Sequence, residues 1–193
     1  MRQFVFKTPK RFQTKVNHLQ KLISKKNPIC LISNFTGRKL RFDIIIKHAN
    51  LDKEAKWGNK NEIFIDFKNR PRYLWLSICH ELAHIILRNP PWYKDSKIKI
   101  IIKKHKDYRT PNYKYDFTYA IEQTLAILIQ ATCEEELEIR SLKWNDWRST
   151  FEHMDVLDFG KKFWKGWLRY LKNKSKYKNI DKWLLEELIK FSP

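Results

Sequence analysis

The residues with the clearest chemical potential lie in one short segment, His80-Glu81-Leu82-Ala83-His84. Histidines four residues apart lie on the same face of a helix, one turn from each other. Two neutral imidazoles placed in this way can bind one zinc ion. The glutamate flanks the same face, so its carboxylate can reach a water on the metal without being a ligand. The spacing therefore predicts a zinc site in which Glu81 serves as the general base of a hydrolysis.

The flanking sequence predicts that this segment is a buried helix. Mostly apolar residues occupy positions 73–79, with Ser77 as the exception, and apolar residues fill positions 85–87. Pro71 suits a first helical turn, and Asn89-Pro90-Pro91 ends the helix. The alternative is a polar stripe on an amphipathic surface helix. The apolar flanks favour the metal site, because a buried helix must satisfy any polar side chains that it carries.

A second long helix is predicted over residues 117–141, and the third zinc ligand should come from it. Glu122 lies 38 residues after His84 and is an acid among apolar neighbours. Packing of this helix on the first would carry the carboxylate into the core, where an unpaired charge is costly. Binding to zinc would remove that cost.

Further acids, Glu134–Glu138, lie near the end of the same helix. We interpret the cluster as a solvated face, because so many adjacent acids cannot all be buried. Glu135 or Glu138 is the alternative third ligand if the helix has a different register.

The remaining pattern predicts an α+β fold. Residues 40–47 are expected to form a strand, and residues 54–57 and 62–67 a hairpin. Residues 93–115 are expected to be a loop or extended segment that contains a short strand, Ile98–Ile102. The expected architecture is a small antiparallel or mixed sheet packed on the two long helices, with extra C-terminal helices.

The motif and the order of the elements around it resemble the zincin metallopeptidases, and in particular the small gluzincins, which include the peptidases that cleave phage and stress-response repressors. The resemblance is strongest at residues 72–88 and looser over 40–140. It implies Zn²⁺ as cofactor and a protein or peptide as substrate. The longer metzincin motif is excluded, because Leu87 and Pro90 stand where its glycine and third histidine would be.

The resemblance also implies how a substrate would be held. In this family an extended peptide pairs with an edge strand beside the metal. We expect Ile63–Phe67 to be that edge, with an internal core strand as the alternative. A tyrosine or histidine near the metal could donate to the oxyanion, and the segment after the motif helix offers His105, Tyr108, Tyr113 and Tyr115 without singling one out.

Two units are expected along the chain. Residues 1–141 would form the zincin-like domain, with residues 1–39 as an N-terminal helical segment. Residues 142–193 would form a Trp-rich helical subdomain. Its tryptophans recur at helical spacing, which favours a role in the core over stacking on nucleobases.

Composition bears on location and partners. The formal net charge is +19, and most of the excess lies in residues 1–70 and 141–193. Such an excess can attract nucleic acid, although it also fits a general bias toward lysine. The three cysteines form no close pair, and no apolar stretch is long enough to cross a membrane. Together with the absence of a signal peptide, this predicts a reduced, cytoplasmic setting.

These observations predict a zinc-dependent endopeptidase. His80, His84 and Glu122 would hold the metal, and Glu81 would activate the water that attacks the peptide carbonyl. The alternative is a basic nucleic-acid-binding protein with a structural or vestigial metal site.

Overall fold

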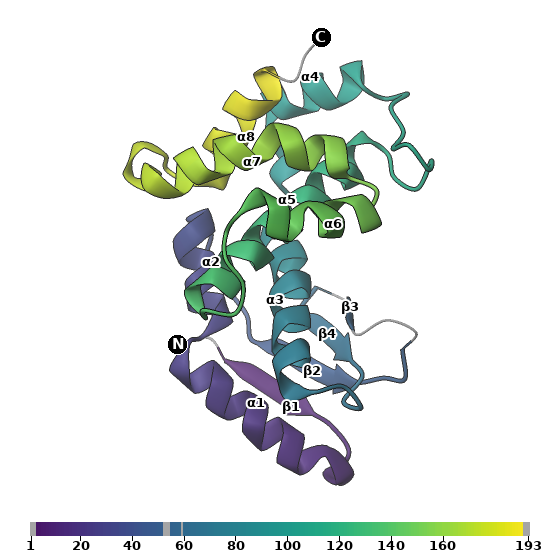
Figure 1. Cartoon of the computed structure of the whole chain (residues 1–193), viewed down its shortest axis with the longest axis vertical. Helices are drawn as coiled ribbons and strands as arrows, with labels where there is room; N and C mark the ends of the chain where they lie inside the picture. The colour runs from purple at the N-terminus through teal and green to yellow at the C-terminus, as the bar shows by residue number, and fades with distance from the viewer. Residues whose placement is uncertain (1–2, 52–54, 59, 191–193) are drawn as a thin grey trace.

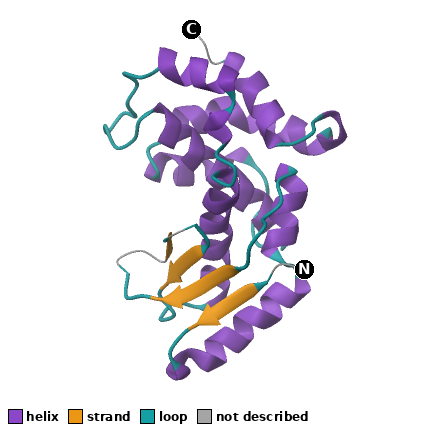
Figure 2. Ribbon diagram, turned by 180° about the vertical axis from the view of Figure 1, so that it is seen from behind, coloured by secondary structure: helices purple, strands orange, loops and turns teal. Residues whose placement is uncertain are grey.

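The computed structural model describes residues 3–51, 55–58 and 60–190 and has an α+β fold. A small sheet lies in the N-terminal half of the molecule, whereas the C-terminal half is helical (Figures 1 and 2). Within the described ranges, no helix has the length and apolar character needed to cross a bilayer.

The sheet contains four described strands in the order β1-β2-β4-β3. Their bounds are Phe4–Lys7 for β1, Ile44–His48 for β2, Ala55–Trp57 for β3 and Glu62–Ile65 for β4. Strands β1, β2 and β4 run parallel, and only the short β3 runs antiparallel. The expectation of an antiparallel or mixed sheet is therefore corrected to a largely parallel one. The N-terminal strand was not predicted, and a helical crossover joins it to β2, as parallel pairing requires. Strand β4 also runs parallel to β2, because β3 lies between them in the chain and reverses its direction.

The predicted hairpin is found in part. Strand β3 pairs antiparallel with β4, with Ala55 opposite Ile65, whereas Glu54 and Asn59 lie outside the described residues. Strand β4 lies between β2 and β3, so Ile63–Phe67 is not an edge. The prediction that this strand receives an extended substrate is wrong. Ile63 and Ile65 of β4, and Phe67 just after it, are fully buried and hold the sheet against the helices.

Eight α-helices are found among the described residues. Their bounds are Gln13–Lys25 (α1), Pro28–Thr36 (α2), Pro71–Leu87 (α3), Ser96–Lys104 (α4), Phe117–Glu136 (α5), Trp144–His153 (α6), Leu157–Lys172 (α7) and Ile180–Ile189 (α8). Short 3₁₀ turns occupy Lys10–Phe12, Trp92–Lys94 and Lys174–Lys176.

The segment predicted as the strand Ile98–Ile102 is instead part of helix α4. The Asp95 carboxylate caps this helix by accepting from the backbone N–H groups of residues 97 and 98. Ile98 and Ile101 are buried one turn apart, while Ile100 is exposed. A run of β-branched residues suggested a strand, but a capped N-terminus and helical spacing of the buried positions outweigh that local preference.

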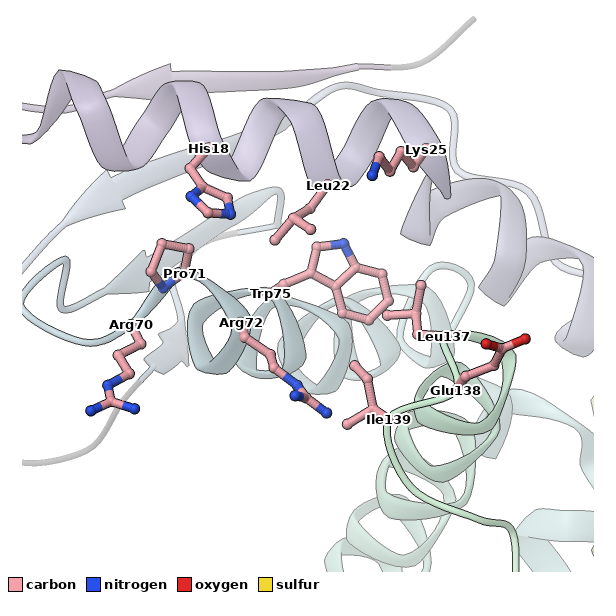
Figure 3. A pocket seen from close by; sticks show the side chains of 10 residues that line it. All are labelled: His18, Leu22, Lys25, Arg70, Pro71, Arg72, Trp75, Leu137, Glu138 and Ile139. Atoms are coloured by element: carbon pink, nitrogen blue, oxygen red, sulfur yellow. The ribbon is translucent and has the colours of Figure 1, made fainter.

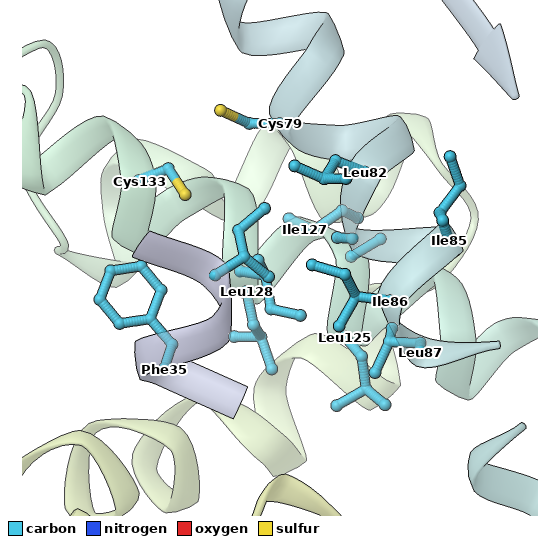
Figure 4. Packing of buried hydrophobic residues seen from close by; sticks show 14 of the residues in the cluster. Phe35, Cys79, Leu82, Ile85, Ile86, Leu87, Leu125, Ile127, Leu128 and Cys133 are labelled. Atoms are coloured by element: carbon cyan, nitrogen blue, oxygen red, sulfur yellow. The ribbon is translucent and has the colours of Figure 1, made fainter. Parts of the chain in front are cut away.

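Helices α3 and α5 form the centre of the molecule and position the predicted site. Helix α3 begins at Pro71, as predicted, and helix α5 begins after an Asp116 cap that accepts from the backbone of Tyr119. Figure 4 shows the apolar side chains that pack around this contact, among them Leu82 and Leu125. Helix α5 ends at Glu136, earlier than predicted.

The C-terminal helices pack on α5 through buried tryptophans. Trp147, Trp167 and Trp183 are each 1% exposed or less. The indole N–H of Trp167 donates to Thr132 Oγ1 on α5 at 2.9 Å. The prediction that these tryptophans belong to the core is confirmed, and a continuous cluster of buried side chains spans both parts of the described chain.

Candidate metal centre

The two histidines of the motif face each other across one turn of α3. The Nε2 atoms of His80 and His84 are 3.3 Å apart. His84 is almost fully buried, and His80 is half-buried against α5. The predicted pair is therefore assembled, with both rings directed to the same point between the two helices.

The Nδ1 atom of each imidazole faces a hydrogen-bond acceptor on α5, and this contact orients the ring. His84 Nδ1 lies 2.8 Å from Glu122 Oε1, and His80 Nδ1 lies 3.0 Å from Gln130 Oε1. The amide of Gln130 in turn donates to Glu134 Oε1 at 2.9 Å, which fixes its oxygen toward the imidazole. Carboxylate and amide oxygens can only accept, so both histidines carry their proton on Nδ1 when neutral. Their Nε2 lone pairs then point toward each other.

That arrangement suits a bound cation. Burial, reinforced by the charge of His84, lowers the pKa of His80 to about 3, so its ring is neutral near pH 7. Two Nε2 lone pairs at this separation repel each other, and either a proton on one ring or a metal cation between the rings removes that repulsion. Tetrahedral zinc with Zn–N distances of about 2.0–2.1 Å requires nitrogens about 3.3 Å apart. The histidine pair therefore fits two ligand positions of a zinc ion.

Glu122 is buried beside His84, on the Nδ1 side of the ring. Its Oε1 also accepts from Arg88 Nε at 2.7 Å, so one carboxylate oxygen serves both partners. In this rotamer it orients the imidazole from behind and does not face the Nε2 atoms. Carboxylates in that position fix the tautomer of a metal-binding histidine and raise its basicity.

The alternative acids for the third ligand position do not reach the histidines. Glu135 and Glu138 are exposed at the end of α5, where Glu135 Oε2 accepts from the backbone N–H of Leu142. Glu134, in contrast, is buried, and burial raises its pKa. The interpretation of the whole cluster as a solvated face is therefore corrected for this residue, which supports Gln130 behind His80.

Gln123 is the third polar group at the Nε2 edge, and the sequence did not indicate it. Its side chain is buried, and its amide Nε2 is 3.1 Å from His80 Nε2. A half-turn of the amide places its oxygen there instead, at an equivalent distance. Among the described residues, no group of three or more His, Cys, Asp or Glu side chains is arranged to hold a metal. The polar groups found at this edge are two imidazoles and one amide.

Glu81 lines a cleft beside the histidine pair. The cleft has a volume of about 910 Å³ and is walled by α3, α5, α6 and the segment after α5, with no strand residue among its lining. The side chain is 8% exposed and shares the cleft with His80. A carboxylate at the edge of a solvent-filled space next to two imidazoles can accept a proton from water.

The aromatic residue in contact with the histidine pair is Tyr119, which is none of the four candidates predicted from the sequence. Its ring stacks on that of His84 with centroids 6.5 Å apart. Burial raises its pKa to about 12, so the phenol keeps its proton and can donate. His105 instead stacks on Phe117, and Tyr113 is exposed.

The cysteines beside the site are buried thiols. Cys79 and Cys133 are both fully buried, and their side chains form a hydrogen bond. Burial raises the pKa of Cys79 well above its ordinary value, so it remains a thiol. As predicted, Cys79 is a small core residue, and it packs behind the histidine face.

The lowered pKa of His80 predicts a specific loss of stability in acid. The unfolded chain binds a proton at this histidine below pH 6.5, whereas the folded protein does not until pH falls to about 3. The metal-free protein should therefore be most stable above about pH 6.5. It should lose up to about 1.4 kcal/mol per pH unit from this group as pH falls. Urea unfolding in the presence of a chelator measures this slope.

The matched variant for that measurement is His80→Gln, which keeps a polar side chain but cannot titrate. The stability of this variant should depend less on pH between about pH 4 and 5.5, where the difference in slope corresponds to close to one proton. An unchanged slope in the variant would show that His80 is not the group that titrates.

Comparison of the chain with protein-family models, with curated proteins and with solved structures finds no match.

Proposed function

We propose that the protein is a zinc-dependent peptide hydrolase. The observation that carries the proposal is the pair of imidazoles with Nε2 atoms 3.3 Å apart, each oriented by an acceptor at Nδ1, beside a cleft that contains Glu81. Zinc bound there would polarise a carbonyl and acidify a water. A structural zinc site is normally closed by four protein ligands, whereas this one opens on the cleft.

The residues of the chain have distinct roles in this proposal. His80 and His84 hold the metal through Nε2, and the amide oxygen of Gln123 supplies a weak third ligand. Glu122 orients His84 by accepting from its Nδ1. Glu81 takes the proton of the attacking water and passes it to the leaving amine, and Tyr119 donates to the oxyanion.

The role of Glu122 separates this arrangement from the one predicted by sequence. Glu122→Gln keeps an acceptor for His84 Nδ1 but removes the charge, so zinc affinity should fall by about 10–100-fold, as for outer partners of metal-bound histidines. Competition with a fluorescent zinc chelator measures the change. Gln123→Ala is the companion variant, and it should weaken zinc without affecting the His84 ring.

A different result for Glu122→Gln would make the carboxylate a metal ligand. If Glu122→Gln loses zinc as completely as His84→Ala, the carboxylate is a direct ligand and moves from the position seen here. Gln123→Ala would then leave the affinity unchanged.

The proposed activity itself is tested with a diverse peptide mixture. Zinc-loaded protein should cleave a subset of peptides, 1,10-phenanthroline should stop cleavage, and added zinc should restore it. Mass spectrometry identifies the products and the cleaved bonds. Zinc binding without cleavage of any peptide would favour a structural metal site and the alternative of a nucleic-acid-binding protein.

A further inference from the structure

The cleft beside Glu81 continues into a second space on the far side of two arginines. This neighbouring pocket has a volume of about 560 Å³ and lies between α1, the start of α3 and the segment after α5. Arg70, Arg72 and Ile139 line both spaces. A ligand that reaches from one to the other must therefore pass these side chains.

The neighbouring pocket is apolar at its centre. Leu22, Trp75 and Leu137 surround it, as Figure 3 shows. Trp75 is 1% exposed, and its indole N–H has no partner among the described residues. The indole nitrogen lies on the side of α1, toward Leu22 and Lys25 (Figure 3). A buried donor without an acceptor is costly, and an oxygen of a bound ligand would satisfy it.

The junction between the two spaces is positively charged. Arg70 and Arg72 are exposed, and neither forms an ion pair with a described residue. Their guanidinium groups lie on the same side of the pocket, while the Glu138 carboxylate points away from them (Figure 3). Arg140 adds a further positive charge on the cleft wall. Arg72 and Arg140 also act electrostatically on the buried Glu134 carboxylate, but the cleft lining holds three arginines against two glutamates. Exposed guanidinium groups in this position favour carboxylates, which they bind in two-pronged geometry.

The backbone that carries Arg70 is held in place. Lys15 Nζ donates to the carbonyls of Phe67, Lys68 and Asn69, at 2.6, 2.8 and 3.1 Å. This contact ties the turn before α3 to helix α1. The arginine therefore starts from a fixed backbone, which lowers the cost of ordering the junction when a ligand binds.

We infer that the cleft and the neighbouring pocket form one groove for an acidic peptide, with an apolar side chain in the Trp75 pocket and carboxylates against Arg70 and Arg72. The inference depends on the proposed function, since it names the substrate class of the same site. The overall charge of +19 acts in the same direction by attracting acidic partners. A peptide is favoured over nucleic acid because the centre of the neighbouring pocket is apolar, lined by Leu22, Trp75 and Leu137, and suits an apolar side chain.

Binding is tested in the Glu81→Gln protein, so that no peptide is cleaved. The probe is a fluorescein-labelled peptide with one Phe flanked by Glu residues on both sides, and the comparison peptide has Gln in place of each Glu. The acidic peptide should bind more tightly, and the double change Arg70→Gln with Arg72→Gln should weaken it about tenfold. The Gln peptide should hardly respond to the double change. Trp75→Phe should weaken both peptides about threefold, since it removes one hydrogen bond.

A matched control is Arg148→Gln with Lys161→Gln, which removes the same charge from exposed positions outside the groove. Equal effects of the two double changes would mean that overall charge alone attracts the peptide, and would overturn the inference. Binding of single-stranded DNA in preference to the acidic peptide, through the same arginines, would overturn it in favour of nucleic acid.

The inference and the proposed function fail in different ways. Tight, arginine-dependent binding of an acidic peptide that the wild-type protein never cleaves would leave the groove in place and reject the hydrolase. Cleavage of peptides with no preference for acidic residues would support the hydrolase and reject the groove for an acidic peptide.

Discussion

Glu81→Gln is expected to lower kcat/KM for peptide hydrolysis by about 10²–10⁴-fold while zinc remains bound. The side chain lies next to His80 on α3 and lines the cleft, so it can reach a water at the metal but is not one of the groups that converge at the Nε2 edge. An amide has the same shape as the carboxylate but cannot accept the proton. Loss of a general base costs about this factor.

The measurement combines three quantities on the same sample: kcat/KM for a cleaved peptide, zinc content, and the melting temperature. The matched control is Glu152→Gln, which makes the same chemical change at an exposed position on α6 outside the cleft lining. It should behave as wild type in all three. Should Glu81→Gln lose its zinc, Glu81 would be a ligand. Should it retain activity, another group would be the base.

The part of the site that sequence predicts well is the part encoded locally. His80 and His84 come together because four residues make one helical turn, and the apolar flanks ensure that this turn is buried. Pro71 and the proline pair after Asn89 place the ends of the same helix correctly to within a few residues. None of these inferences needs any knowledge of distant parts of the chain.

The groups behind the histidines could not be predicted in this way, because they depend on the register between α3 and α5. A shift of α5 by one turn would bring different side chains to the two histidine nitrogens. The sequence therefore places Glu122 near the site but does not show that it lies on the Nδ1 side of His84. Gln123 and Gln130 are chemically unremarkable in sequence and gain their roles only from packing.

The errors in the fold have related causes. Strand β1 was missed because its four residues carry little signal until they pair with β2, and the parallel pairing of β2 with β4 depends on a register that is set only in the folded sheet. Helix α4 was predicted as a strand because isoleucines favour strands, whereas its Asp95 cap and the burial of Ile98 and Ile101 determine the outcome. In both cases a tertiary contact outweighs a local preference.

His84→Ala is expected to eliminate measurable zinc binding at micromolar metal, with a loss well beyond 100-fold. Changing an outer partner such as Glu122 costs about 10–100-fold, and removing a direct ligand must cost more. His84 is 1% exposed, so its loss also leaves Glu122 with Arg88 alone and lowers stability.

Because that variant could fail to fold for this reason, His80→Ala is measured beside it: this ring is only half-buried, and zinc should be lost while circular dichroism stays native. His18→Gln, an exposed histidine on α1, is the control for incidental binding to imidazole and should keep full affinity. Isothermal titration with zinc ranks all of the variants. Zinc affinity that survives in a folded His80→Ala protein would mean that the histidine pair does not form the metal centre, and the proposed hydrolase would have to be abandoned.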